Sequence, residues 1–518
     1  MASFIQEHMS KITGMISGWD RLRFRGTVRM LANVAGLWRF LSHTGRYLLK
    51  DFGVHAEELS RRTRGESLAV AAAAGRPVVP LQNPGVCKED MAREIQARDG
   101  IKEGLICVLT AVEPCWSYHI KSNKETRRLE LVRAYRKCQH LYHYYQHPVF
   151  GFMHVRLQTW LPFNQWVCIN GREWLGRQMD AAGIKYLRRE NCFAWISDVT
   201  RAQALLEEQV RFNWAQGLGE LVPKVNPAFV GIRGDCAMGY YWSLEESEWA
   251  SDIMFKDQGE LSRLYEGLIR HGMVALGSSE VMRFLGHKVR ADGQPHGNFG
   301  LEVVSDLKER PEGIRIKHRV GSNSLKMYNK QGTVLRVETT LNNVRELKAP
   351  RLKEGRVEWQ RMRKGVADIQ RRAEVSQAAN ERYLQAMAAA ENPLPLKTLT
   401  EALAQPVVRD GQRVRGLNLL GASDARLLAT VGDGKFLLYG FRNKDLRAML
   451  FAVPADSPRE LRRRSGQITR QLRLLRAHGL IRKVSGTHRY LVTDKGRQVI
   501  TALQVAREAD VMKLAKAA

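Results

Sequence analysis

Four acidic residues are candidates for binding a divalent metal ion. Asp20 lies in a predicted strand, and Glu113 lies near the end of a predicted buried strand. Glu248 and Asp252 are four residues apart, which is one turn of the helix predicted there. Mg²⁺ prefers carboxylate oxygens, and two such ions held by this set could hydrolyse a phosphodiester bond. The alternative for Glu248 and Asp252 is a solvated helix start, where acidic side chains interact favourably with the helix dipole.

A second group of candidates lies in residues 319–342, RVGSNSLKMYNKQGTVLRVETTLN. Its Gly-Ser-x-Ser, Tyr-x-Lys and Arg-x-Glu elements resemble a signature of the replication initiators of rolling-circle plasmids, although the His-hydrophobic-His metal pair of that family is missing. The resemblance implies that Tyr328 is a DNA-nicking nucleophile and that Glu338 is a metal ligand or an acid-base carboxylate. It implies that Lys330 and Arg336 bind the scissile phosphate. The alternative is a hairpin in which Tyr328 packs across strands while Arg336 and Glu338 form an ion pair on one face.

Histidine, cysteine and aromatic residues give weaker signals. Four histidines are close together in the sequence, but the aromatic residues around them predict ordinary sheet neighbours: His140, His143, His147 and His154. The 7 cysteines are scattered without a Cys-x-x-Cys pair, so we expect buried thiols and neither a zinc ribbon nor a disulfide framework. Aromatic and basic residues are mixed in residues 142–160 and 166–177. That mixture suits stacking of unpaired bases beside phosphate contacts, or else an ordinary sheet face packed on a helix.

The C-terminal residues have the most specific pattern in the chain. The expected elements are helices at residues 425–430, 443–451 and 459–478, and strands at residues 480–484 and 488–492. Pro458 is placed to begin the third helix and Gly479 to end it. Apolar side chains along this third helix are expected to face a core: Leu461, Ile468, Leu472 and Leu475.

This order of elements resembles the winged helix of MarR- and ArsR-type bacterial regulators, most closely over residues 470–497. The resemblance implies that the third helix enters the major groove of DNA and that the hairpin meets phosphates or the minor groove. The residues implied in binding are Arg462, Arg463, Arg464, Arg470, Arg473, Arg476, Arg482, Lys483, Thr487, His488 and Arg489. The alternative is a winged helix that contacts protein or double-stranded RNA.

These candidates belong to a chain of the α+β class with several domains, in which mixed sheets and helices precede a helical connector and the winged helix. The predicted parts are a mostly helical N-terminal region (1–100), an α+β domain (101–220), a second α+β domain with the Tyr-x-Lys/Arg-x-Glu hairpin (221–350), a basic connector helix (351–395) and the winged-helix domain (396–518). The connector helix is expected at residues 353–390, followed by the linker Asn-Pro-Leu-Pro at residues 392–395.

The charge balance indicates a polyanionic partner. Lys and Arg total 82 against 53 Asp and Glu, a formal net charge of +29. Phosphate backbones neutralise such an excess, so DNA, RNA or both are the expected partners. A membrane surface is disfavoured because the basic residues are spread over segments that look folded. No apolar run is long enough to span a membrane, and no secretory signal is visible, so we expect a cytoplasmic protein.

These patterns predict a nucleic-acid-binding protein of a mobile-element or plasmid-like system that cuts or nicks nucleic acid with a divalent metal such as Mg²⁺. Carboxylates would then act as they do in RNase H-like nucleases. The alternatives are a non-enzymatic RNA-binding component of a ribonucleoprotein and a DNA-binding transcriptional regulator. A homodimer is compatible with either function, because winged helices often work as dimers.

Overall fold

The computed structural model describes residues 2–508 apart from residues 84, 228–238, 275, 288, 290–299, 311–312, 389–395, 410, 420, 434–435, 437–439 and 452. The predicted linker at residues 392–395 therefore lies outside the described residues. The chain divides into two units. Unit 1 comprises Met1–Thr13, Ile253–Val337 and Ala378–Ala518, and unit 2 comprises Gly14–Asp252 and Glu338–Gln377. The fold is of the mixed α+β class, and the described residues form one large mixed sheet and four two-stranded sheets.

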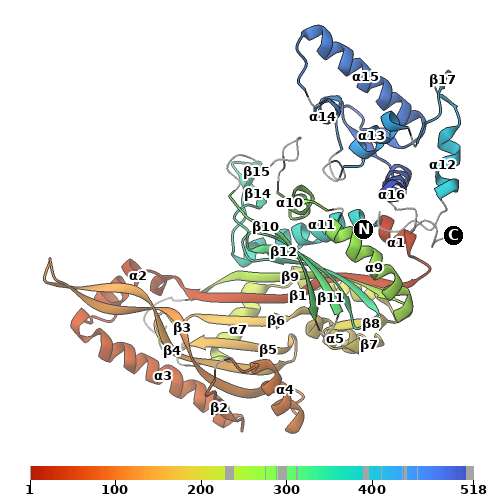
Figure 1. Cartoon of the computed structure of the whole chain (residues 1–518). Coiled ribbons are helices and arrows are strands. Elements are labelled where there is room, and N and C mark those ends of the chain that lie inside the picture. The colour runs from red at the N-terminus through yellow and green to blue at the C-terminus, as the bar shows by residue number, and fades with distance from the viewer. Residues whose placement is uncertain are drawn as a thin grey trace. The chain divides into compact units, whose positions relative to one another are not determined.

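Unit 2 is built on a sheet with the strand order β13-β9-β1-β6-β5-β4-β3-β2 (Figure 1). The strands are β1 (Ile12–Val28), β2 (Val78–Pro80), β3 (Gly104–Asn123), β4 (Arg128–His147), β5 (Gly151–Gln158), β6 (Gln165–Asn170), β9 (Tyr240–Phe255) and β13 (Val334–Leu341). Strands β1, β6, β5, β4 and β3 pair antiparallel, and the short β2 pairs parallel with β3. The strand predicted at residues 19–28 is confirmed, and it begins earlier, at Ile12.

Strand β1 shows why this sheet has one polar and one apolar face. Leu22 and Phe24 are fully buried, whereas the alternate residues Arg21, Arg23 and Arg25 remain partly or largely exposed. The Phe24 ring stacks on the ring of Trp214, 5.0 Å away, in helix α7 (Trp214–Val225). The period-two pattern of β1 thus places helix packing on one face of the sheet and arginines on the other.

Helices and a small hairpin complete unit 2. The helices are α2 (Val34–Arg39), α3 (Phe52–Ala73), α4 (Lys88–Arg98), α5 (Gly171–Ala181), α6 (Val199–Arg211) and α7, and the hairpin is formed by β7 (Tyr186–Arg189) and β8 (Cys192–Ile196). The amphipathic pattern of residues 171–183 predicts a helix, and Asp198 is placed to cap a second helix through residue 210. Both helices are confirmed. Each begins after an amide or carboxylate cap: Asn170 accepts hydrogen bonds from the first turn of α5, and Asp198 from that of α6.

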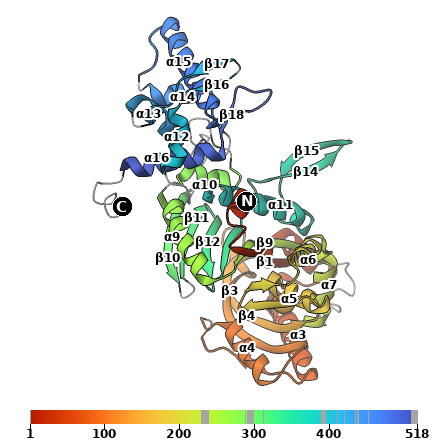
Figure 2. The ribbon, with the colours of Figure 1, turned by 90° about the vertical axis from the view of Figure 1, so that its right-hand side faces the viewer.

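The predicted connector helix is wrong in its first half. Strands β14 (Lys348–Lys353) and β15 (Arg356–Arg361) form a hairpin there, and only α11 (Ile369–Met387) is helical. Glu354 and Gly355 have φ angles of 50° and 76°, which make the two-residue turn that joins antiparallel strands. The sequence prediction overlooked this glycine and the alternation of apolar and charged residues beside it. Figure 2 shows the hairpin as a separate ribbon.

Unit 1 contains a smaller antiparallel layer in the order β10-β11-β12-β13. Its strands before β13 are β10 (Val303–Arg310), β11 (Gly313–Val320) and β12 (Asn323–Lys330), and its helices include α1 (Ala2–Glu7), α9 (Gln258–Val274) and α10 (Ser278–Phe284). The sequence pattern predicts helices at residues 258–271 and 278–285 and strands at residues 301–305, 313–318, 325–328 and 334–340. These six elements are confirmed, with shifts at their ends. Local periodicity was sufficient here because each strand is short and bounded by a turn.

The C-terminal elements agree closely with the sequence prediction. They are α12 (Leu396–Ala404), β16 (Val407–Arg409), β17 (Gln412–Val414), α13 (Ala422–Val431), α14 (Asn443–Leu450), α15 (Pro458–Ala477), β18 (Ile481–Lys483), β19 (Tyr490–Val492) and α16 (Asp494–Glu508). The Ser457 hydroxyl caps α15, Pro458 is its first residue, and Gly479 has a φ of 73° just after its end. Ile468, Leu472 and Leu475 are buried as expected, but Leu461 is 42% exposed because it lies in the first turn, beyond the core.

Candidate metal centre

Three buried carboxylates from distant parts of the sequence come together in unit 2. Asp20 lies on β1, Glu248 on β9 and Glu338 on β13, which are neighbouring strands. One carboxylate oxygen from each lies within 4.8 Å of those of the other two. The three residues are 5%, 7% and 2% exposed. We call this group the carboxylate cluster. It joins two metal-site residues predicted from their type with one implied by the resemblance.

Polar side chains hold the carboxylate cluster in place. The Arg21 guanidinium donates to Glu248 Oε1 at 3.0 Å, and the Thr340 hydroxyl lies 3.4 Å from the same oxygen. Asn191 Nδ2 donates to Asp20 Oδ1 at 2.9 Å. Fixed ligand orientation of this kind is what a metal site requires of its surroundings. Sequence reasoning missed Asn191 and Thr340, and it noted Arg21 only as one arginine in an alternating strand.

The negative charge of the cluster affects the pKa of Arg21. Burial would lower the pKa of this guanidinium, but the carboxylates of Glu248, Glu246, Glu338 and Asp20 together raise it. Two cations lie beside the cluster: Arg21 pairs with Glu248 at 3.0 Å, and Arg172 Nε lies 3.9 Å from Asp20. Two unit charges about 4.8 Å apart repel by on the order of 3 kcal/mol at an effective dielectric constant of about 20. A divalent cation would remove this repulsion, and all three ligands are the oxygens that Mg²⁺ prefers.

Asp252 lies near the cluster but has a different partner. Its carboxylate forms an ion pair with Arg172 Nη2 at 2.9 Å, and both side chains are fully buried. Arg172 Nε lies 3.9 Å from Asp20 Oδ1, so the guanidinium separates the two acids. Glu248 and Asp252 lie on a strand, so the helix predicted for them is wrong. The prediction failed because residues 247–255 are all buried, which hides the period-two pattern.

Glu113 belongs to a separate ion-pair group. Its carboxylate accepts a hydrogen bond from Tyr142 Oη at 2.7 Å and forms ion pairs with Arg156 at 2.9 Å and Lys88 at 3.2 Å. Burial would raise the pKa of Glu113, but these three partners outweigh burial and lower it. The charge of Glu113 is therefore balanced by its own partners. The predicted metal ligands that converge are Asp20, Glu248 and Glu338.

The residues of the tyrosine motif lie on two adjacent strands. Tyr328 and Lys330 are on β12, and Tyr328 is 9% exposed and faces Arg315 of β11 in the register. Arg336 is fully buried on β13, two residues before Glu338, so the two side chains share one face of that strand as expected. Glu338 is the member of this motif that takes part in the carboxylate cluster.

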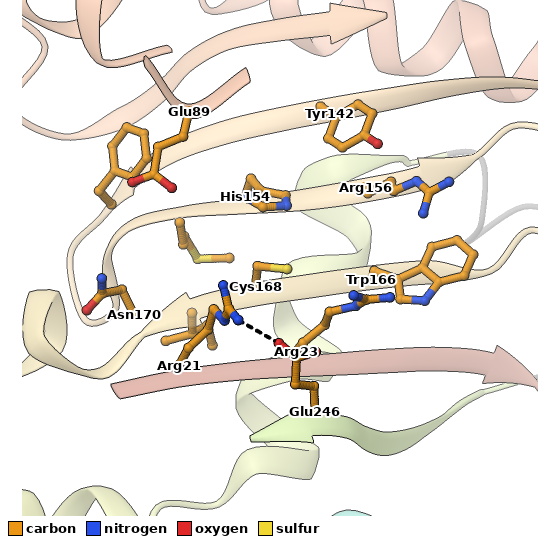
Figure 3. Close-up of a pocket in the computed structure, with 13 residues that line it drawn as sticks. Arg21, Arg23, Glu89, Tyr142, His154, Arg156, Trp166, Cys168, Asn170 and Glu246 are labelled. Atoms are coloured by element: carbon orange, nitrogen blue, oxygen red, sulfur yellow. Dashed lines mark hydrogen bonds and ion pairs between the residues drawn. The ribbon is translucent and has the colours of Figure 1, made fainter. Parts of the chain in front are cut away.

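A hollow of about 350 Å³ lies on the arginine face of the sheet in unit 2. Its lining includes Arg21 and Glu246, which also border the carboxylate cluster, together with Arg23, Arg156 and Trp166 (Figure 3). The Arg156 guanidinium lies 4.7 Å from the centre of the Trp166 ring. Arg23 and Arg156 are half-buried in this lining, where their guanidinium groups could bind a phosphate group.

The four neighbouring histidines lie on β4 and β5, so the prediction that they belong to a sheet is confirmed. His143 is fully buried, and burial lowers its pKa to about 4. The unfolded chain takes up this proton near pH 6.5, so the stability from His143 is complete above that pH and lost as the pH falls to about 4. We expect His143→Leu to reduce the acid-induced fall in the free energy of unfolding between pH 7 and 4.5, measured in urea, by up to about 3 kcal/mol. A fall as steep as that of the wild type would contradict this, and His488→Leu, at an exposed position, is the control.

The predicted nucleic-acid-binding residues of α15 and the hairpin after it divide into two groups. Most are exposed: Arg462, Arg463, Arg470, Arg473, Arg482, Lys483, Thr487 and His488. Arg464, Arg476 and Arg489 are half-buried. Arg464 donates to Glu460 at 2.7 Å and to the Val453 carbonyl at 2.6 Å, so it holds the start of α15 in place.

Comparisons with known proteins found no match for this chain. No protein-family model matches it, no curated protein sequence matches it, and no solved structure matches its fold. Within the part of the chain that the structure describes, no helix combines the length and the apolar character needed to cross a bilayer. Functional inference therefore depends on the geometry of the sites themselves.

Proposed function

We propose that this protein is a Mg²⁺-dependent enzyme that cuts nucleic acid, with the metal held by Asp20, Glu248 and Glu338. The observation that carries this proposal is the convergence of these three buried carboxylates on neighbouring strands. Burying three like charges close together is costly, and a bound divalent cation would offset that cost. The net charge of +29 supports a nucleic-acid substrate.

The geometry supports a division of roles. When bound, the metal polarises a phosphate oxygen and lowers the pKa of a bound water. Arg21 orients Glu248, and the neighbouring Arg23, 43% exposed in its side chain, is placed to bind a phosphate in the adjacent hollow. Water is the preferred nucleophile. The alternative from the sequence resemblance, in which the Tyr328 oxygen displaces one strand end and stays covalently bound to the other, is tested separately.

The test is to incubate the full-length protein with single-stranded and duplex DNA and RNA, with Mg²⁺ or with EDTA. Cleavage only with Mg²⁺ is expected, and it should be lost in Asp20→Asn and kept in the control Glu113→Gln. Absence of cleavage of all four substrates, or equal loss in both variants, would contradict the proposal. Tyr328→Phe separates the nucleophiles, because only a tyrosine mechanism predicts loss of cleavage and of a protein–nucleic acid adduct.

We also propose that residues 422–492 form a winged helix that binds duplex nucleic acid. In support, two helices precede the basic α15 and a hairpin follows it, and Phe441, between the first two helices, pairs with Tyr490 of β19 as a third short strand. If the carboxylate cluster does not cut nucleic acid, a winged helix at residues 422–492 would suit a DNA-binding regulator. Retained duplex binding without cleavage in any metal would favour that second function.

The exposed arginines of α15 allow a quantitative prediction. If Arg470 and Arg473 each contact a phosphate, the double variant Arg470→Ala, Arg473→Ala should lower the slope of log affinity against log salt by about 2. Fluorescence anisotropy with a labelled duplex at several salt concentrations measures this slope. Arg263→Ala, on the exposed face of α9, is the control. An unchanged slope in the double variant would remove α15 from the interface.

A further inference from the structure

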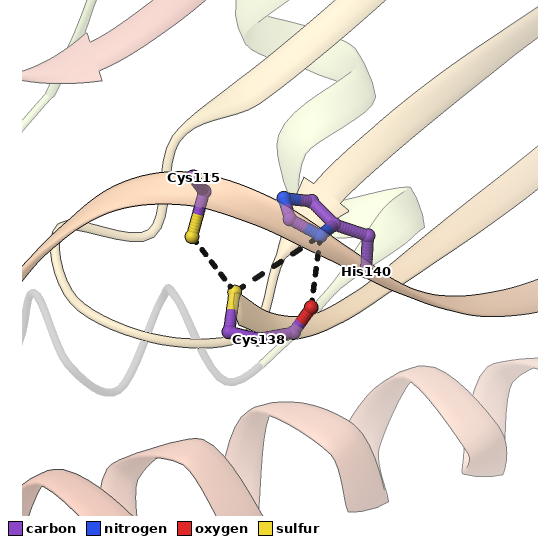
Figure 4. A group of neighbouring side chains, drawn as sticks. All are labelled: Cys115, Cys138 and His140. Carbon is purple, nitrogen blue, oxygen red and sulfur yellow. Dashed lines mark hydrogen bonds between the residues drawn. The ribbon is translucent and has the colours of Figure 1, made fainter. Parts of the chain in front are cut away.

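Two cysteines and a histidine meet on the β3–β4 ribbon, away from the carboxylate cluster. The antiparallel register pairs Glu113 with Cys138 and Ala111 with His140. Cys115 is therefore diagonal to Cys138, and His140 follows Cys138 by two residues on the same face. Cys115 Sγ lies 3.1 Å from Cys138 Sγ, and Cys138 Sγ lies 4.0 Å from His140 Nδ1 (Figure 4).

We propose that Cys115, Cys138 and His140 form a zinc site. One ligand atom from each residue lies within 4.8 Å of those of the other two. Thiolate and imidazole are the ligands that Zn²⁺ prefers, whereas Mg²⁺ prefers oxygens, so this site and the carboxylate cluster select different ions. The zinc site is independent of the proposed cleavage activity.

His140 provides the second observation. Its side chain is fully buried, and among the described residues its Nε2 has no hydrogen-bond partner. Its Nδ1 lies 3.2 Å from the Cys138 carbonyl oxygen, to which an Nδ1–H would donate. Metal-binding histidines are commonly oriented in this way, with one ring nitrogen on a backbone carbonyl and the other on the ion. A buried imidazole nitrogen without a partner is costly, and a bound cation would satisfy it.

The spacing requires only small adjustments for zinc. With Zn–S bonds of about 2.3 Å, a tetrahedral ion holds two thiolate sulfurs about 3.7 Å apart. The observed 3.1 Å between Cys115 and Cys138 would need to lengthen by a few tenths of an ångström, a rotation of either side chain. Three protein ligands leave a fourth position for water or an added ligand. Cys138 also lines a hollow of about 700 Å³, which gives an ion a route to the site.

The experiment measures metal directly. Full-length protein purified with a reducing agent is analysed for zinc by mass spectrometry, and its metal is exchanged for Co²⁺, whose bond to thiolate gives a charge-transfer absorption band. We expect about one zinc per chain and a cobalt–thiolate band. Both should be lost in Cys138→Ser and retained in the control Cys168→Ser, a half-buried cysteine outside the group.

The wild type alone can overturn the proposal. If reduced wild-type protein binds neither Zn²⁺ nor Co²⁺, the site is not a zinc site, whether or not the variants fold. Equal zinc content in Cys138→Ser and the wild type would also reject it. Peptide mapping that finds Cys115 and Cys138 joined in a metal-free protein would assign the pair to a disulfide instead. Mg²⁺-dependent cleavage is read separately, so a failure of either proposal can be recognised on its own.

Discussion

Replacing Glu338 with Gln should lower the rate of Mg²⁺-dependent cleavage at least about a hundredfold, because metal-ion catalysis supplies several kcal/mol to the transition state. The amide that replaces the carboxylate is neutral and a weaker ligand for a hard cation. Glu338 is the cluster member with the least exposure, 2%, so no water can take its place without a rearrangement. Initial rates over a range of Mg²⁺ concentrations measure the effect, and full activity of the variant would exclude Glu338 as a ligand.

A stability measurement separates loss of the metal from damage to the fold. The free energy of unfolding of Glu338→Gln is compared with that of the wild type, each with and without Mg²⁺. The wild type should gain stability when Mg²⁺ is added, because the ion binds only the folded state, and the variant should not. Glu113→Gln is the matched control, since Glu113 is paired with Arg156 and Lys88. A variant that is less stable than the wild type without Mg²⁺ would indicate a structural role for Glu338.

The cluster could be predicted only in pieces. Asp20 was chosen as an acid in a predicted strand, Glu248 as one of two acids a helical turn apart, and Glu338 through a local resemblance. Their convergence depends on the strand order β13-β9-β1, which joins segments from both ends of unit 2. Pairing between strands so distant in the sequence leaves no local pattern. Even the spacing of Glu248 and Asp252 is ambiguous, because residues i and i+4 share a face in both a helix and a strand.

The C-terminal elements were predictable because their signals are local. Ser457 and Pro458 mark the start of α15, Gly479 marks its end, and the apolar residues between them repeat at the helical period. The hairpin of β14 and β15 also had local signals, in Gly355 and in the apolar residues next to it, but they were read as part of a long basic helix. The metal ligands Cys115 and Cys138 were out of reach, because only the register of β3 and β4 brings them together.

Arg172 had no signal in the sequence, yet it connects the carboxylate cluster to the rest of the sheet. The side chain is fully buried. Its Nη2 donates to the Ala250 carbonyl at 3.1 Å and to Asp252 Oδ2 at 2.9 Å, while its Nε lies 3.9 Å from Asp20. An uncharged residue at this position would leave Asp20 and Asp252 close together without the cation between them.

Arg172→Met should therefore destabilise the protein by about 3–5 kcal/mol, because it leaves Asp252 as a buried charge without its partner. Urea unfolding measures the loss. The double variant Arg172→Met, Asp252→Asn removes both charges and should recover most of it, since a buried ion pair contributes little net stability compared with uncharged side chains. If the double variant is no more stable than Arg172→Met alone, the loss comes from packing and not from charge. Arg172 would then hold the start of α5 against β9 by its shape, and the electrostatic link from Asp252 to Asp20 would not exist.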